Sequence, residues 1–265
     1  MNVERLCEQV SEWARSEPGV RAAFVVGSQA RTDTPADEWS DVDVVLLADE
    51  PARLLDDTSW LSRFGTPLLS FVEETALGGE RERRVLYDDG LEVDFAVFPA
   101  SALAALAADP ATGSVLARGH RILHDEAGLA AALAAAPPPA PPPPREPAEI
   151  AQDFWYHALW TAKKWRRGEA LVARSCLESH LKPLLLEADR SRASGDTWHG
   201  SRFAERWASP EVVDATWSAT ARSPEELPAA LERLCEAFAG QDSPSDTVPL
   251  GRVRARLEEV LGQWR

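Results

Sequence analysis

The chain has 265 residues, with 43 Asp and Glu against 28 Lys and Arg, which gives a formal net charge of −15. Residues 1–144 hold 24 of the acidic and 11 of the basic side chains, so the excess lies mostly in the first half. This balance argues against binding to nucleic acid or to an anionic membrane, because both depend on Lys and Arg. It favours cationic ligands or divalent metals.

The cellular setting is indicated by the cysteines and the apolar segments. Cys7, Cys176 and Cys235 are few, odd in number and far apart, which is typical of a reducing cytoplasm. The N-terminus has no apolar core of a signal peptide, and no apolar run approaches the ~20 residues of a membrane helix. We therefore expect a cytoplasmic protein without a membrane segment.

The first half predicts helices mixed with strands. Val3, Leu6, Val10 and Trp13 recur at helical spacing, which predicts a helix over 3–16. Apolar and alternating runs predict strands at 20–26, 41–48, 66–72, 83–87 and 91–98, and Ala-rich segments predict helices at 100–109 and 126–136.

A proline-rich stretch divides the chain, because proline lacks an amide donor and fits neither helix interior nor central strand. Strand patterns vanish after it, so the second half predicts an all-α helical bundle. Helices are expected at 148–167, 169–190 with an interruption at Pro183, 199–208, 210–220, 224–239 and 249–264. We expect an α+β chain with domains at 1–136 and 148–265, joined by a Pro-rich linker at 137–147.

A small-residue turn follows the first strand at Gly27-Ser28. Glycine permits unusual backbone angles and close approach, and successive amides with a serine hydroxyl suit an anion. Alone, this dipeptide is a weak signal.

Asp41 and Asp43 stand at the start of the second strand, where the period of two puts both carboxylates on one face. Neighbouring carboxylates repel each other, and a divalent cation relieves the repulsion. Ligands that are all oxygens suit Mg²⁺. The alternative is a solvated strand face. Trp39, beside the pair, is expected to pack, with stacking on a nucleotide base as the alternative.

Asp94 lies in the middle of the apolar strand LEVDFAVF, where a carboxylate needs a partner. Considered alone, it favours a buried ion pair with an arginine. Glu92 shares its strand face and is expected to be solvated or ion-paired.

Taken together, strand, Gly-Ser turn, Asp-x-Asp and a later strand Asp resemble the nucleotidyltransferase superfamily of the polymerase-β type. The segments GSQAR, DEWSDVDVVLL, VDFAVF and DFWYHALWTAKKWRRGE are similar to the aminoglycoside 6-adenylyltransferase (streptomycin adenylyltransferase) family over nearly the whole chain. The resemblance implies an N-terminal nucleotidyltransferase mixed sheet flanked by helices, followed by a C-terminal helical domain that binds substrate. We expect a monomer.

The resemblance implies transfer of AMP from ATP to a hydroxyl of a small cationic acceptor, streptomycin first, with pyrophosphate released. Asp41, Asp43 and Asp94 would hold two Mg²⁺ ions, and Asp94 would complete the second metal site, act as general base, or both. Gly27 and Ser28 would grip the terminal phosphates. Arg31 would help, or else form a surface salt bridge.

In the helical half, Lys163 and Arg202 are candidates for phosphate binding, although the family resemblance leads us to expect Lys at the position of Arg202. The alternative for Lys163 and its neighbour Lys164 is a solvated basic face. Candidate carboxylates for the cationic acceptor are Asp153, Glu178 and Asp214.

Two alternatives remain open, and the first belongs to another functional class. Arg174 and His180 match the short Arg-x(4–6)-His pattern of HEPN-type RNase bundles, the partners of small nucleotidyltransferase antitoxins. A toxin–antitoxin-like fusion with protein AMPylation or RNase activity is therefore one alternative, with a packed His180 as the simpler interpretation. A nucleotidyltransferase for another small hydroxyl compound is the other.

Overall fold

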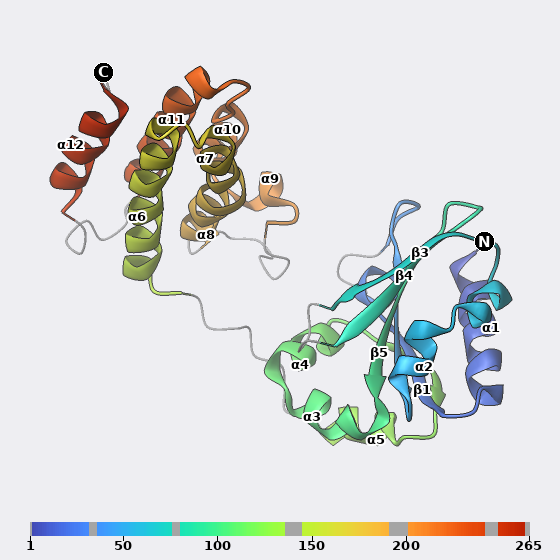
Figure 1. Ribbon diagram of the computed structural model, residues 1–265. Coiled ribbons are helices and arrows are strands. Elements are labelled where there is room, and N and C mark those ends of the chain that lie inside the picture. The colour runs from blue at the N-terminus through green and yellow to red at the C-terminus, as the bar shows by residue number, and fades with distance from the viewer. Residues whose placement is uncertain are drawn as a thin grey trace. The chain divides into compact units, whose positions relative to one another are not determined.

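The structure is a computed structural model, and it describes residues 2–31, 36–75, 80–135, 145–190, 201–241 and 249–262. The chain divides into two compact units, Met1–Pro142 and Pro143–Arg265, and each is described by itself (Figure 1). The predicted linker at 137–147 lies mostly outside the described residues, and the domain limits 1–136 and 148–265 stay predictions.

The first unit is built on a six-stranded mixed sheet with the order β3-β4-β5-β2-β1-β6 among the described residues. Only the central β2–β5 pair is parallel, and the other neighbours are antiparallel. The strands are β1 (Val20–Val26), β2 (Val42–Ala48), β3 (Pro67–Glu74), β4 (Arg81–Tyr87), β5 (Glu92–Pro99) and β6 (Arg121–Asp125). The central strands are apolar on both faces because helices cover both.

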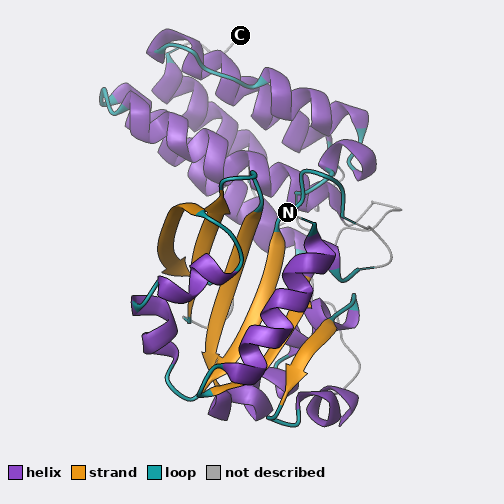
Figure 2. Cartoon of the chain, turned by 90° about the vertical axis from the view of Figure 1, so that its right-hand side faces the viewer, coloured by secondary structure: helices purple, strands orange, loops and turns teal. Residues whose placement is uncertain are grey.

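One face of this sheet packs on α1 (Val3–Ser16) and α2 (Pro51–Asp56). Helix α1 begins after Asn2, whose side chain accepts a hydrogen bond from the amide of Glu4, and it lies along the sheet (Figure 2). The helix packs against β1 and β6. Its buried residues Leu6, Val10 and Trp13 share one apolar core with residues that alternate along β2 and β5: Val42, Val44, Leu46, Val93, Phe95 and Val97.

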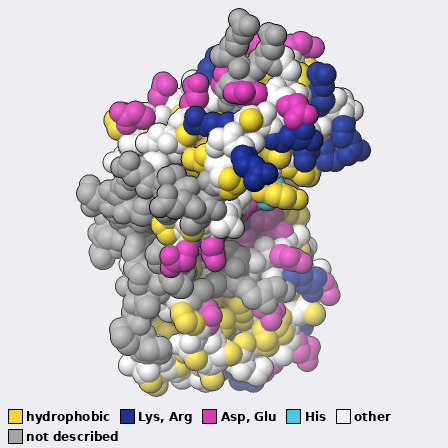
Figure 3. All heavy atoms as spheres, turned by 90° about the vertical axis from the view of Figure 1, so that its left-hand side faces the viewer, with side chains coloured by type: hydrophobic (Ala, Val, Ile, Leu, Met, Phe, Trp, Pro, Cys, Tyr) yellow, Lys and Arg dark blue, Asp and Glu magenta, His cyan; other side chains and the backbone are white. Residues whose placement is uncertain are grey.

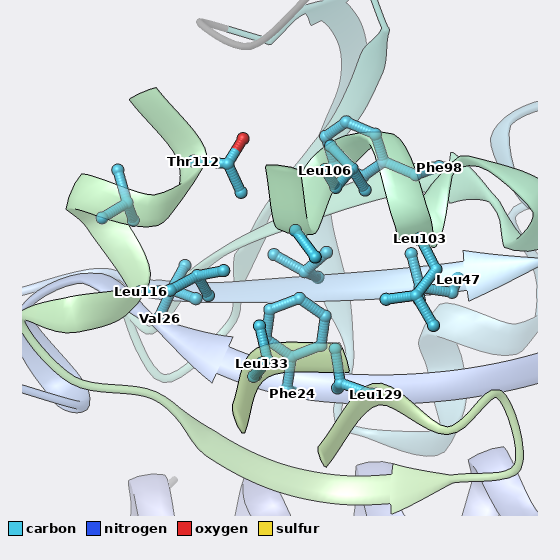
Figure 4. Close-up of a pocket in the computed structure, with 13 residues that line it drawn as sticks. Phe24, Val26, Leu47, Phe98, Leu103, Leu106, Thr112, Leu116, Leu129 and Leu133 are labelled. Carbon is cyan, nitrogen blue, oxygen red and sulfur yellow. The ribbon is translucent and has the colours of Figure 1, made fainter. Parts of the chain in front are cut away.

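The opposite face packs on α3 (Leu103–Ala108), α4 (Pro110–Ala117) and α5 (Leu129–Ala135). Leu47 and Phe98 belong to this core. A cavity of about 40 Å³ lies between the sheet and these helices, lined by apolar side chains and Thr112 (Figure 4). The Thr112 hydroxyl donates to Asp109, so this cavity is a packing gap without groups for chemistry.

The second unit is helical, as predicted. Its helices are α6 (Pro147–Arg166), α7 (Ala170–Cys176), α8 (Lys182–Arg190), α9 (Ala204–Trp207), α10 (Pro210–Ser218), α11 (Leu227–Gly240) and α12 (Leu250–Leu261). Phe154 and Phe238 stack with ring centroids 3.8 Å apart at the centre of its core, and Trp155 packs against both.

No helix within the described ranges is both long and apolar enough to cross a bilayer.

The α+β class, the mixed sheet and the helical second half are confirmed, whereas several elements depart from prediction. Helices α2 and α4 and strand β6 were not predicted, because each is short. The helix predicted over 169–190, interrupted or kinked at Pro183, is interrupted a few residues earlier: a π-helical turn covers Leu177–Leu181, and the amide of Lys182 donates to the carbonyl of Leu177. Pro183 is the second residue of α8 and has no amide to continue the backbone hydrogen bonds of this turn.

Candidate active site

The three predicted carboxylates come together at one edge of the central strand pair. Asp43 in β2 and Asp94 in β5 are register partners in the parallel ladder, so their side chains leave the sheet side by side. Asp41 stands two residues before Asp43, at the entrance to β2. One ligand oxygen from each of the three lies within 4.8 Å of the others. The parallel register is what brings distant sequence positions to one point.

The Gly27-Ser28 turn contacts this cluster directly. Val26, the last residue of β1, is the register partner of Asp43, and the chain then enters a single 3₁₀ turn, Gly27–Gln29. Gly27 has φ +68°, and a Cβ added to it would lie 1.8 Å from Oδ2 of Asp43. Glycine is therefore required both for the backbone angle and for the space that Asp43 occupies.

Ser28 supplies a buried polar atom with no partner among the described protein atoms, since its hydroxyl makes no hydrogen bond. Buried polar atoms without partners are uncommon in folded proteins, and such an atom is free to bind a water, an ion or a ligand. The side-chain amide of Gln29 donates to the backbone carbonyl of Asp41 over 3.4 Å, which ties the turn to the strand entrance. Arg31 is half-buried just beyond the turn.

Asp94 is the most buried of the three carboxylates, at 9% exposure. Burial raises the pKa of Asp94 to about 7, the guanidinium of Arg84 lowers it, and the charges of Glu82, Asp41 and Asp43 add to the rise. Arg84 lies 3.5 Å from Asp94, and it also pairs with Glu73 at 2.6 Å and Glu82 at 2.8 Å. Asp94 therefore has both the arginine partner that a buried carboxylate favours and a place in the carboxylate cluster.

The donor set fits a hard divalent cation. All three side chains offer carboxylate oxygens, the ligands that Mg²⁺ prefers. One arginine shared among three carboxylates compensates the charge of Asp94 only in part, and its contact to Asp94 is the longest of the three. The family's metal chemistry is thus compatible with the residues present.

Glu92 is exposed at the start of β5, as expected. The expectation that Trp39 packs is wrong: its side chain is 86% exposed, two residues before Asp41. The reason is local, because the residues just before it form an exposed turn in which Asp37 accepts hydrogen bonds from the Trp39 amide and the Ser40 hydroxyl.

The basic candidates of the helical unit are exposed. Lys163 stands on the last turn of α6, and Arg202 precedes α9. Lys164 forms an ion pair with Glu169 at 2.6 Å and lies over the Trp160 ring. Lys and Arg side chains gather on this unit (Figure 3). The phosphate-binding roles of Lys163 and Arg202 stay predictions.

The acidic candidates of the helical unit have three different environments. Asp214 is exposed on α10. Glu178 pairs with Lys182 at 2.7 Å and lines an open groove of about 520 Å³, together with Arg174, Glu205 and Trp217. Asp153 contacts Arg145, His157 and His180.

The sequence interpretation missed Arg84, Glu205 and Trp217. Arg84 is the antiparallel register partner of Asp94, but nothing in the segment RERR shows which arginine faces the carboxylates. Glu205 and the 71% exposed Trp217 join Glu178 only through the packing of the helices around the groove. His180, singled out with Arg174 for the RNase alternative, lies beside Asp153 and His157. That alternative stays a prediction.

A mixed sheet with three carboxylates on neighbouring strands and a Gly-Ser turn against them defines the nucleotidyltransferase class. The family model for streptomycin adenylyltransferase matches residues 1–241, so the chain belongs to that family and is a nucleotidyltransferase enzyme. Comparison with the curated proteins gave no match.

Three solved structures are similar to the chain at low identity. An aminoglycoside 6-adenyltransferase from Bacillus subtilis has 14% identity and a TM-score of 0.36, covering 100% of this chain and 94% of its own. A nucleotidyltransferase-like protein from Exiguobacterium sibiricum 255-15 has 13% identity and a TM-score of 0.36, covering 98% and 88%. A CCA-adding enzyme in complex with CTP has 13% identity and a TM-score of 0.33, covering 98% and 68%.

Proposed function

We propose that the enzyme transfers AMP from ATP to a hydroxyl of an aminoglycoside, with streptomycin as the first candidate, and releases pyrophosphate. The observation that carries the proposal is the carboxylate cluster of Asp41, Asp43 and Asp94 with the Gly27-Ser28 turn packed against it. Membership in the streptomycin adenylyltransferase family supports the transferred group and the acceptor class.

In the proposed reaction, the acceptor oxygen forms a bond to the α-phosphorus of ATP while the bond to pyrophosphate breaks. Asp41 and Asp43 would hold the metal that accompanies the triphosphate, and Asp94 would complete a second metal position, accept the proton of the acceptor hydroxyl, or do both. Two Mg²⁺ ions, when bound, would neutralise charge on the attacking and leaving oxygens. The Gly27 amide and the Ser28 hydroxyl donate to the terminal phosphates, and Arg31 assists.

For the acceptor, we assign the groove of the helical unit. It carries the carboxylates of Glu178 and Glu205, and Trp217 offers an exposed aromatic face. Carboxylates bind ammonium and guanidinium groups through charge-assisted hydrogen bonds, and aromatic faces attract cations. Asp153 is already compensated by Arg145 and Glu178 by Lys182, so Glu205 is the strongest candidate, followed by Glu178 within the groove and Asp214 on α10. Lys163 and Arg202 are proposed to contact phosphate.

The proposed setting follows from composition. An acidic chain with free cysteines suits a monomer in the cytoplasm whose partners are ATP and a cationic small molecule, with no nucleic acid and no membrane as partner.

The test is incubation with ATP labelled at the α-phosphate, Mg²⁺ and a panel of aminoglycosides, followed by separation of adenylylated products. Streptomycin should be labelled, and Asp43→Asn should abolish labelling. Glu92→Gln is the matched control, since it removes a carboxylate from the exposed start of β5 and should leave labelling intact. Labelling of another hydroxyl compound or of a protein, with every aminoglycoside unlabelled, would refute the substrate assignment.

A further inference from the structure

The helical unit contains a second group of candidate metal ligands that the proposed reaction does not use. Among the described residues, His157, His180 and Asp153 offer ligand atoms that converge, as the three carboxylates of the first unit do. Asp153 and His157 are one turn apart on α6, and His180 comes from the π-helical turn Leu177–Leu181. Single π-turns within helices occur frequently at functional sites, and this one carries the ligand that closes the group.

The three donor atoms form a small, nearly equilateral triangle. Oδ1 of Asp153 lies 2.8 Å from Nδ1 of His157 and 2.9 Å from Nε2 of His180, and the two nitrogens lie 3.1 Å apart. Donors on one face of an octahedral ion with bonds of ~2.1 Å are ~3.0 Å apart, whereas a tetrahedral ion separates them by ~3.4 Å. The triangle has the size of an octahedral face.

Hydrogen bonds within the group compete. Nδ1 of His157 also lies 3.0 Å from the backbone carbonyl of Asp153, so it can donate either to that carbonyl or to Oδ1. If both facing nitrogens carry hydrogen, both can donate to Oδ1, and the two N–H groups then lie side by side across 3.1 Å. If either nitrogen lacks hydrogen, its lone pair faces Oδ1 of Asp153 at 2.8 or 2.9 Å, and a cation between the three atoms relieves that repulsion.

The neighbours of Asp153 orient its carboxylate toward the two histidines. Arg145 donates to the other oxygen of Asp153, Oδ2, at 2.9 Å, which orients the group and leaves Oδ1 facing the histidines. Burial acts to raise the pKa of Asp153, but the hydrogen bonds from His180 and Arg145 hold that pKa below its ordinary value. The side chains are 21% to 40% exposed, so water can fill the remaining coordination positions.

We propose that Asp153, His157 and His180 form a binding site for one first-row transition-metal dication. Two imidazoles with one carboxylate, arranged on one face with open positions, suit Zn²⁺, Ni²⁺, Co²⁺ or Fe²⁺ and not Mg²⁺, which prefers oxygen ligands. The ion joins α6 to the π-helical turn and stabilises the helical unit. This site is separate from the oxygen-only cluster of Asp41, Asp43 and Asp94, and it does not depend on the proposed reaction.

The test is titration of the untagged full chain with Co²⁺ and with Ni²⁺ in a large excess of Mg²⁺, which occupies the oxygen-only cluster. Calorimetry should show one equivalent bound, and the visible absorption of Co²⁺ should report nitrogen and oxygen ligands. His157→Ala and His180→Ala should each remove this binding. His120→Ala is the matched control, since His120 is exposed in the other unit and contacts only the Leu116 carbonyl among the hydrogen bonds given for it, and this variant should bind normally. The ion should raise the melting temperature of the wild type and of H120A only.

Four results would overturn the proposal. The first is a dissociation constant weaker than roughly 0.1 mM in the wild type. The second is full binding by H180A that still has a native circular dichroism spectrum. The third is displacement of Co²⁺ by Mg²⁺, which would place the ion at the carboxylate cluster. The fourth is a thiolate-to-cobalt charge-transfer band, which would assign the ion to a cysteine such as the half-buried Cys176.

Discussion

The Asp43 carboxylate occupies the space that a side chain on Gly27 would need: a Cβ there would lie 1.8 Å from Oδ2 and 2.9 Å from Cγ of Asp43. The two residues are held there by the antiparallel pairing of Val26 with Asp43. The turn proposed to bind phosphate and the carboxylate proposed to bind metal are thus positioned by one strand pair, so a change in either should displace the other.

Gly27→Ala should therefore abolish transfer, because the new methyl group drives the Asp43 carboxylate from its place. The positive φ adds roughly 1 kcal/mol of backbone strain. Gly90→Ala provides the control, since Gly90 has φ +86° and a Cβ there meets nothing within 4 Å. G90A should lose roughly 1 kcal/mol of unfolding free energy from the same kind of strain, measured in urea, and it should keep its transfer rate. Equal activity of the two variants would show that the contact with Asp43 has no catalytic importance.

Ser28→Ala should leave stability unchanged and weaken ATP binding. Its hydroxyl is buried without a partner, so its removal breaks no hydrogen bond in the free protein. A hydrogen bond to a charged phosphate is worth about 1.5–3 kcal/mol, so KM for ATP should rise roughly 10- to 100-fold.

Ser11→Ala is the matched control, and it should change stability without changing ATP binding. The Ser11 hydroxyl donates to the carbonyl of Leu123 at 2.7 Å, so its loss should cost about 1 kcal/mol in unfolding and leave KM for ATP unchanged. Urea melts and initial rates on both variants separate the two outcomes. A normal KM in S28A would remove the hydroxyl from the phosphate site.

Strand periodicity predicted that Asp41 and Asp43 share one face, because that is a local pattern. The grouping of Asp94 with them was an expectation from the resemblance to the nucleotidyltransferase superfamily, and the parallel β2–β5 register brings the three together. Arg84 was not predictable, because its place beside Asp94 depends on the register of β4 against β5. Register follows from side-chain packing across the sheet, which the segment RERR does not reveal.

The helical unit was less predictable for the same reason. Helical periodicity located α6, but it gave no sign that His157 of α6 and His180 of the π-helical turn would meet at Asp153. That meeting needs the wider turn at Leu177–Leu181, and a π-turn has no local sequence pattern.

Asp94→Asn should stabilise the metal-free enzyme while removing activity. Burial and the neighbouring Asp41, Asp43 and Glu82 all disfavour the charge of Asp94, and Arg84 keeps its pairs with Glu73 and Glu82 when that charge is removed. In EDTA the melting temperature of D94N should rise by roughly 2–4 °C for each kcal/mol gained.

Mg²⁺ should raise the melting temperature of the wild type, because an ion that binds only the folded state stabilises it. This gain should vanish in D94N and persist in the control Glu92→Gln. Transfer by D94N should fall on the order of 100-fold or more. A lower melting temperature of D94N in EDTA would instead identify the Asp94–Arg84 pair as a stabilising contact.

Glu205→Gln tests the groove as the acceptor site. The substitution keeps the size of the side chain and removes a negative charge that would face a cationic drug, so KM for streptomycin should rise roughly tenfold, about 1.4 kcal/mol. KM for ATP should stay constant, because Glu205 is not among the proposed phosphate ligands. Glu211→Gln is the control, since Glu211 is exposed on the first turn of α10 and does not line the groove. A parallel rise in KM for streptomycin in both variants would mean that the charge of the unit acts at long range, and the effect would then disappear at high salt.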